Sequence, residues 1–218
     1  VHAEGATAST EEALTMGIVS LTPASIKKWI TISDEAIDLS GEEFIDYIYD
    51  ELTYRIAKKA QEELLGKIVA LTASATSTAV GVGIVAGTPS VGLVAQAIGQ
   101  LTDDATDPVV VMNKSSWAQF KAAQYAGSFN VDPFEGLRVV YDNTLPAYTS
   151  TGTAGSTWMI VGDFGYGSQA NFPNGSEIDI KYDDLSLAEK DLVKLVGRQF
   201  VGLGIVGHKA FTKVTFPS

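Results

Sequence analysis

The most regular pattern of apolar residues in this chain lies between residues 40 and 66. Apolar side chains recur there at steps of three and four residues, which places them in one stripe along a helix. Ser40 and Glu43 have the spacing of a capping box, and Gly66 stands where a glycine commonly ends a helix. At about 1.5 Å per residue, the sequence predicts a helix about 37 Å long. The stripe consists of Phe44, Ile45, Ile48, Leu52, Ile56, Ala60 and Leu64.

Shorter β-prone runs lie on both sides of this helix. Before it, residues 18–22 and 26–32 are separated by Pro23. After it, an apolar run at residues 107–113 leads directly into an amphipathic segment at 115–123, which indicates a strand followed by a helix. Three further runs predict strands in the last part of the chain, at residues 177–182, 196–205 and 209–216.

Residues 68–102 carry no charged side chain, and they offer one alternative chemistry. Gly81, Gly83 and Ala86 have the Gly-x-Gly-x-x-Ala spacing of a dinucleotide-binding turn, and Asp103 and Asp104 follow about 20 residues later. That turn needs a strand before its first glycine and a helix at the phosphate, whereas Ser and Thr precede it here and Pro89 follows closely. The sequence therefore favours a flexible loop and then a helix at residues 91–101. Its glycines and its proline also exclude a transmembrane helix.

The charge of the chain is strongly acidic, with a net value of −11 over 218 residues. Residues 1–66 hold 13 acidic and 5 basic side chains, whereas residues 67–218 hold 13 and 10. A protein that grips nucleic-acid phosphates needs clustered Lys and Arg, and the sequence shows no such cluster. Acidity also keeps many globular proteins soluble, so this balance alone does not identify a function.

Candidate catalytic chemistry is sparse. Cysteine is absent, and His2 and His208 are far apart, so no metal-ligand spacing appears. Asp103, Asp104 and Asp107 lack the spacing of a calcium-binding loop and read more simply as a solvated loop before a strand. Trp117 and Phe120, three residues apart on the predicted helix, indicate core packing. We therefore predict no catalytic residue, no cofactor-binding residue and no metal ligand, and no enzymatic activity.

Several of these features in their order along the chain resemble one protein family. The strand and helix at 107–123 are followed by Phe134-Glu135-Gly136-Leu137, by Leu145-Pro146, by Val161-Gly162-Asp163-Phe164 and by the closing strand at 209–216. With the long helix and its entry at residues 29–35, this series resembles the major capsid proteins of tailed bacteriophages, which have the Hong Kong 97-type fold. The resemblance covers nearly the whole chain, although each motif alone has low specificity.

The resemblance implies an α+β fold in two discontinuous domains. A peripheral domain, comprising residues 34–66 and 167–204, would hold the long spine helix and an antiparallel sheet. An axial domain, comprising residues 67–166 and 205–218, would hold a central sheet with flanking helices. Residues 1–33 would form part of an extended arm called the E-loop. On this alignment the chain begins inside the E-loop, and the N-terminal arm and the ascending strand of the loop are missing.

Some members of the family cross-link their subunits, and this sequence departs from that pattern. The reaction joins an E-loop lysine to an asparagine, with a glutamate as general base. Alignment backwards from Ala210 and Phe216 places Arg198 at the glutamate position and Asp191 at the asparagine position. Arginine accepts no proton, an aspartate carboxylate is a poor electrophile, and no lysine precedes Lys27. We expect the subunits to be held together without covalent bonds.

The function that the resemblance implies is that of a structural subunit of an icosahedral phage head. It would assemble with itself into pentamers and hexamers, enclose DNA without sequence-specific binding, and work with scaffolding, protease and portal proteins. Its expected locations are the virion and, during assembly, the cytoplasm of the bacterial host, with no membrane partner. The alternatives are the shell of an encapsulin nanocompartment and, more distantly, a dinucleotide-binding enzyme.

Overall fold

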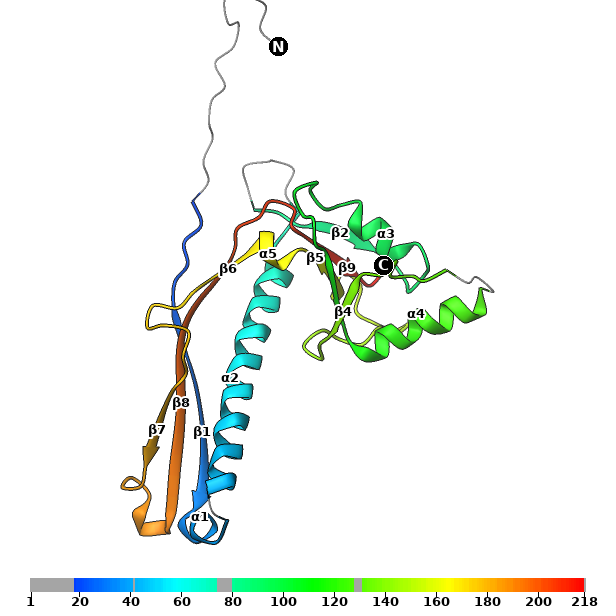
Figure 1. The fold of residues 1–218 in the computed structure, drawn as a ribbon. Coiled ribbons are helices and arrows are strands. Elements are labelled where there is room, and N and C mark those ends of the chain that lie inside the picture. The colour runs from blue at the N-terminus through cyan, green and yellow to red at the C-terminus, as the bar shows by residue number, and fades with distance from the viewer. Residues whose placement is uncertain (1–17, 41, 74–79, 128–130, 218) are drawn as a thin grey trace, which may run out of the picture.

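The computed structural model describes residues 18–40, 42–73, 80–127 and 131–217, and it contains two sheets linked by one long helix (Figure 1). The four-stranded sheet is built on β8 (Leu192–Ile205). The edge strand β1 (Ala24–Ser33) pairs antiparallel along one side of β8. Two short antiparallel strands, β6 (Ser168–Asn171) and β7 (Asp179–Asp183), pair with β8 as well. The predicted strand at residues 18–22 is wrong, because β1 begins only after Pro23.

The long helix α2 (Glu42–Ala70) packs on one face of this sheet, after the short helix α1 (Asp34–Ser40). The apolar stripe is confirmed, because Ile48, Leu52 and Ile56 are buried with Leu195 and Val201 of β8. Alternate residues of β8 face the helix, as expected for a half-covered strand. Gly197 of β8 lies under the helix, where an added Cβ would come within 3 Å of the side chains of Leu52 and Ile56.

The end of α2 differs from the prediction. Gly66 lies inside the helix, which continues to Ala70. Tertiary packing accounts for the continuation, because Leu65 and Ile68 enter a second core against the other sheet. Lys213 of that sheet then donates from its Nζ to the carbonyl oxygens of Val69 (2.8 Å) and Leu71 (2.5 Å), and so caps the helix end. The predicted N-terminal cap at Ser40 and Glu43 lies on side chains outside the described part of the structure.

The five-stranded sheet has the order β2-β9-β5-β3-β4. Its central strand β5 (Thr157–Gly162) is buried throughout and runs antiparallel to β9 (Phe211–Thr215) and β3 (Val109–Met112). The outer strands β2 (Gly83–Ala86) and β4 (Arg138–Tyr141) pair in parallel with β9 and β3, respectively. The structure thus confirms the predicted strands at 107–113 and 209–216.

The structure differs from the predicted flexible loop at residues 83–86. They form strand β2 rather than a flexible loop, although residues 74–79 before them lie outside the described part. The second and last glycine of the pattern, Gly83, is packed so closely that an added Cβ would meet Cβ of Gln100 at 2.5 Å. The glycines therefore serve close packing at a sheet edge, and a strand occupies the place where a dinucleotide site needs a phosphate-binding turn.

Helices cover both faces of the five-stranded sheet. On one face, α3 (Leu93–Ile98) and α4 (Lys114–Ala126) enclose a core that includes Phe120 and Trp158. Trp117 packs beside this core, edge-on to Tyr141, which confirms the structural interpretation of that residue. On the other face, the last turns of α2 cover Val111, Ile160 and Phe211. The remaining short elements are α5 (Phe164–Gly167) and a 3-10 turn (Ala188–Lys190).

The burial of the stripe on α2 predicts a strong dependence on side-chain volume. Leu52→Ala should lower the free energy of unfolding by about 2 to 5 kcal/mol, because Leu52 has no exposed surface and truncation leaves a cavity. Asp50→Ala, an exposed control on the same helix, should change it by less than about 0.5 kcal/mol. Chemical denaturation would compare the two variants, and equal losses would show that the stripe does not face the core.

Candidate functional site

The motif at residues 161–164 forms a sharp corner where β5 runs into α5. A carboxylate oxygen of Asp163 accepts hydrogen bonds from the backbone N–H groups of Gly165 (2.9 Å) and Tyr166 (3.1 Å). Its other oxygen accepts from the N–H of Asp107 at 3.1 Å, which ties the loop before β3 to the corner. This arrangement caps α5 and fixes two segments that lie more than 50 residues apart in the sequence.

Hydrogen bonding controls the charge of this carboxyl group. Burial raises the pKa of Asp163, but N–H groups of Tyr166, Asp107, Gly165 and Thr106 stabilise the carboxylate and bring the pKa below its ordinary value. Gly162 is equally constrained, because an added Cβ would lie 2.5 Å from the carbonyl oxygen of Ala210. Close packing at Gly162 and the hydrogen bonds that Asp163 accepts from backbone N–H groups therefore explain the motif, without a catalytic role.

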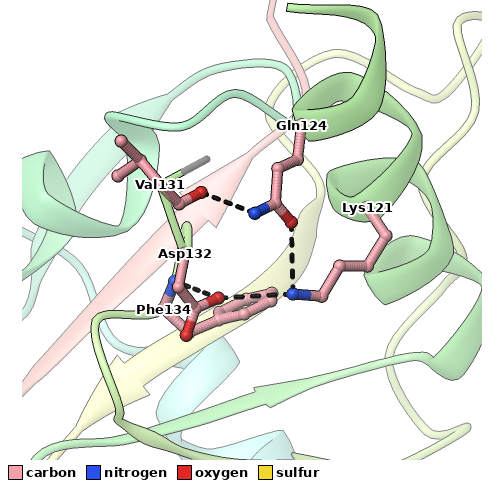
Figure 2. A network of polar contacts seen from close by, with 5 residues as sticks. All are labelled: Lys121, Gln124, Val131, Asp132 and Phe134. Atoms are coloured by element: carbon pink, nitrogen blue, oxygen red, sulfur yellow. Dashed lines mark hydrogen bonds and ion pairs between the residues drawn. The ribbon is translucent and has the colours of Figure 1, made fainter. Parts of the chain in front are cut away.

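A polar network holds the end of α4 against the segment at residues 131–134 (Figure 2). Lys121 Nζ lies 3.3 Å from both Asp132 Oδ1 and Gln124 Oε1, and Gln124 donates to the carbonyl of Val131 at 2.7 Å. The ammonium group also lies 5.7 Å from the ring of Phe134. The network fixes one side of a tip that carries the exposed side chains of Tyr125 and Val131.

The face of the four-stranded sheet that points away from α2 carries aromatic and charged side chains. Trp29 on β1 is 64% exposed, and Lys194 Nζ lies 5.4 Å from its ring. Arg198 lies 5.2 Å from the ring of Phe200 and pairs with Asp179 at 2.9 Å. Interfaces between proteins are enriched in such aromatic and arginine side chains. This surface has the composition of a contact face.

The two positions aligned with cross-linking chemistry lie on or near this sheet. Arg198 forms an ion pair with Asp179. Asp191 has a positive φ of 51° at the turn into β8, and its carbonyl accepts from the N–H of Asp34. Lys27 of β1 lies opposite Arg198 in the sheet, but the two aligned positions hold an aspartate and an arginine in place of the amide electrophile and the carboxylate base.

A hollow of about 810 Å³ lies where α2 passes the edge of the five-stranded sheet. Its walls are largely apolar, from Leu64 and Leu65 on α2 and Val109 and Val111 on β3. Its rim is polar and includes Asp104, Asp107, Arg138 and Asp163. The carboxylate of Asp163 is already satisfied by backbone donors, so the rim lacks a free catalytic group at that position.

The described residues offer neither a metal-binding group nor a helix suited to cross a membrane. Across residues 18–40, 42–73, 80–127 and 131–217, no three His, Asp or Glu side chains gather in a group suited to a metal ion. Asp103 and Asp104 lie in an exposed loop. Within those same ranges, none of the helices combines the length and the apolar character that crossing a membrane would require.

Comparison with known proteins gives a consistent result. The family model described as the phage capsid family matches residues 1–216. No curated protein sequence matches the chain. Among solved structures, the capsid of an empty GTA particle has a TM-score of 0.67 at 15% identity, covering 98% of this chain and 81% of that one. A protein of Mycobacterium phage Adephagia has a TM-score of 0.62 at 14% identity, covering 91% and 73%.

A structure from a different kind of shell is also similar. The holo-SrpI encapsulin complex from Synechococcus elongatus has a TM-score of 0.60 at 12% identity, covering 88% of this chain and 73% of that one. At these identities the structural likeness shows the fold alone, which is the predicted α+β fold of the Hong Kong 97 type.

The Asp163 corner predicts a measurable pH dependence. Because its folded pKa lies below the ordinary value of about 3.9, its stabilisation is complete above that value and is lost as the pH falls through the folded pKa. Asp163→Asn places an amide donor against backbone donors and should cost about 1 to 3 kcal/mol at pH 7. Denaturation of both proteins between pH 7 and pH 3 would measure the difference, which should shrink toward pH 3. A constant difference would contradict the assignment.

Proposed function

Because the chain belongs to the phage capsid family, we propose that it is the repeating subunit of an icosahedral phage head that encloses DNA. The observation that carries this proposal is the family match over residues 1–216, together with the shared fold of capsid structures. In this role, copies of the chain would form pentamers and hexamers. Portal, scaffolding and protease proteins would be its partners, and its locations would be the virion and, during assembly, the host cytoplasm.

The arrangement of the subunit supports this role. A shell subunit must present several contact surfaces on a framework that holds them in fixed relation. Here the four-stranded sheet, whose strand β1 carries the exposed Trp29, lies at one end of the molecule, and α4, which carries the exposed Tyr125, packs on the other sheet (Figure 1). The helix α2 joins the two through its packing in both cores. We assign the four-stranded sheet with α2 to the peripheral domain and the five-stranded sheet to the axial domain.

The encapsulin-type shell is the second candidate, and the likeness to the SrpI encapsulin is the observation that favours it. Both candidates are shells of the same fold, and they differ in what is enclosed. Purified particles would be analysed for nucleic acid and for enclosed protein, since DNA supports the phage head and a single cargo enzyme supports the encapsulin. The dinucleotide-binding enzyme is not proposed, because strand β2 occupies the position of its turn.

The capsid proposal predicts self-assembly. The full-length protein should form ring-shaped capsomers or closed shells, because a subunit of this fold gains enough buried interface through repeated contacts to offset its loss of rotational and translational freedom. Light scattering and negative-stain microscopy would detect these particles across a series of salt concentrations. A protein that remains monomeric at high concentration in every condition would contradict the proposal.

We also predict that the shells contain no self-catalysed cross-links. The reaction needs an amide electrophile and a carboxylate base, and Asp191 and Arg198 stand at those positions. Particles boiled in detergent should therefore give a single gel band at the mass of one subunit. A ladder of covalent oligomers that survives reductant would show that other residues perform the reaction, and Asn171 and Asn174 would be the first electrophiles to replace.

A further inference from the structure

The fold brings together basic residues that are scattered in the sequence. Two neighbouring hollows, of about 370 and 540 Å³, lie between α2 and the edge strand β1 and share Lys28 and Lys59 in their walls. Together they define what we call the basic groove. Its cationic lining residues are Lys27, Lys28, Arg55, Lys58, Lys59 and Lys67. The sequence expectation that no basic cluster exists is therefore wrong, because the cluster forms only when β1 packs beside α2.

The charge of the groove contrasts with that of the chain. Its six basic residues face three acidic ones, Glu51, Glu62 and Glu63, whereas the remaining residues of the chain hold nine basic and 23 acidic side chains. The acidic residues of the groove are already occupied. Glu51 pairs with Arg55 at 2.5 Å, and Glu62 and Glu63 both pair with Lys59, at 3.5 and 3.3 Å.

Three cations that face the groove are left without an acidic partner among the described residues. Lys28 and Lys67 make no ion pair there, and Lys58 bonds only to the neutral Oδ1 of Asn143, at 3.2 Å. Lys27 also makes no ion pair there, but it alternates with Lys28 along β1 and lies opposite Arg198, on the sheet face away from α2. These residues are held on two rigid elements, since β1 is paired along its whole length with β8 and α2 is a continuous helix. The groove thus carries its unpaired lysines on a rigid backbone framework.

We propose that the basic groove binds the phosphate backbone of nucleic acid without reading its sequence. This inference rests on the proposed function and adds to it a defined contact between the subunit and the enclosed DNA. Lysines with nearby hydroxyl groups at Thr22 and Ser25 contact phosphates but give no base recognition.

An acidic protein segment is the competing partner, and the composition of the groove is less suited to it. Protein interfaces are centred on aromatic and arginine side chains in desolvated pockets. The groove has one arginine, Arg55, which is paired with Glu51, and one aromatic residue, Trp29, whose ring already lies against Lys194. Its unpaired cations are all lysines. The acidic remainder of the chain does not prevent phosphate contact at physiological salt, where charges further away than about 8 Å are largely screened.

The test compares two variants with the same change in net charge. Lys28→Gln with Lys67→Gln removes two unpaired cations from the groove, and Lys181→Gln with Lys190→Gln removes two exposed cations elsewhere. Fluorescence anisotropy with a labelled 30-base-pair duplex of mixed sequence would be measured between 50 and 200 mM NaCl. Circular dichroism would confirm folding, and Lys28→Gln with Lys58→Gln would serve as the groove variant if the first pair fails to fold.

The expected wild-type slope of log affinity against log salt is about −3, because three unpaired cations contact phosphates. The groove variant should bind about tenfold more weakly and reduce the slope by about 2, whereas the control should stay within about twofold of wild type. Equal losses in both variants, or no binding by the wild type at 50 mM NaCl, would overturn the proposal. Tighter binding of poly-glutamate than of the duplex would also overturn it, in favour of an acidic protein partner.

These outcomes are separate from those that test the shell. Particles that form normally while the groove variant binds DNA as well as wild type would refute the groove and leave the proposed function standing. A chain that binds the duplex through the groove but never assembles would refute the shell.

Discussion

The structure depends on one helix being buried in two cores. The first turns of α2 place Ile48, Leu52 and Ile56 against the four-stranded sheet, and its last turns place Leu65 and Ile68 against the five-stranded sheet. Lys213 completes the connection, because its ammonium group caps the carbonyls at the helix end and finds no carboxylate partner among the described residues. Burial lowers the pKa of Lys213, so those carbonyl contacts compensate for a costly position. Gln61 adds a further tie through its hydrogen bond to Asp142.

This shared helix gives the surfaces of the molecule a fixed relation to each other. The exposed sheet face with Trp29 and the tip held by Lys121 and Asp132 lie on different sheets. α2 packs directly on the first sheet, and it covers the face of the second sheet opposite α4. Surface ion pairs such as Lys121–Asp132 contribute little stability, typically below about 1 kcal/mol, so their role is to orient a segment. The buried groups, including Asp163 and Gly162, carry the stability of the corners.

Local patterns predicted the elements whose signal is repeated over many residues. The stripe on α2 and the apolar run of β3 followed by its helix are of this kind, because several residues agree on one periodicity. The sequence did not predict β2, since a short strand among glycines forms only by pairing with β9 more than 120 residues later. The sequence also predicted that the helix ends at Gly66, whereas it continues to Ala70. The core that buries Ile68 and the lysine that caps the helix end, Lys213, are both distant in sequence. The basic groove was missed because its lysines come together only in three dimensions.

The central physical claim is that α2 makes the two sheets one cooperative unit, and calorimetry tests it most directly. Differential scanning calorimetry of the unassembled chain should show one unfolding transition whose calorimetric and van't Hoff enthalpies agree, as expected for two-state unfolding. Lys213→Met, which removes the cap but retains much of the side-chain volume, should lower the midpoint without dividing the transition. Two separate transitions in the wild-type protein, one for each sheet, would contradict the account.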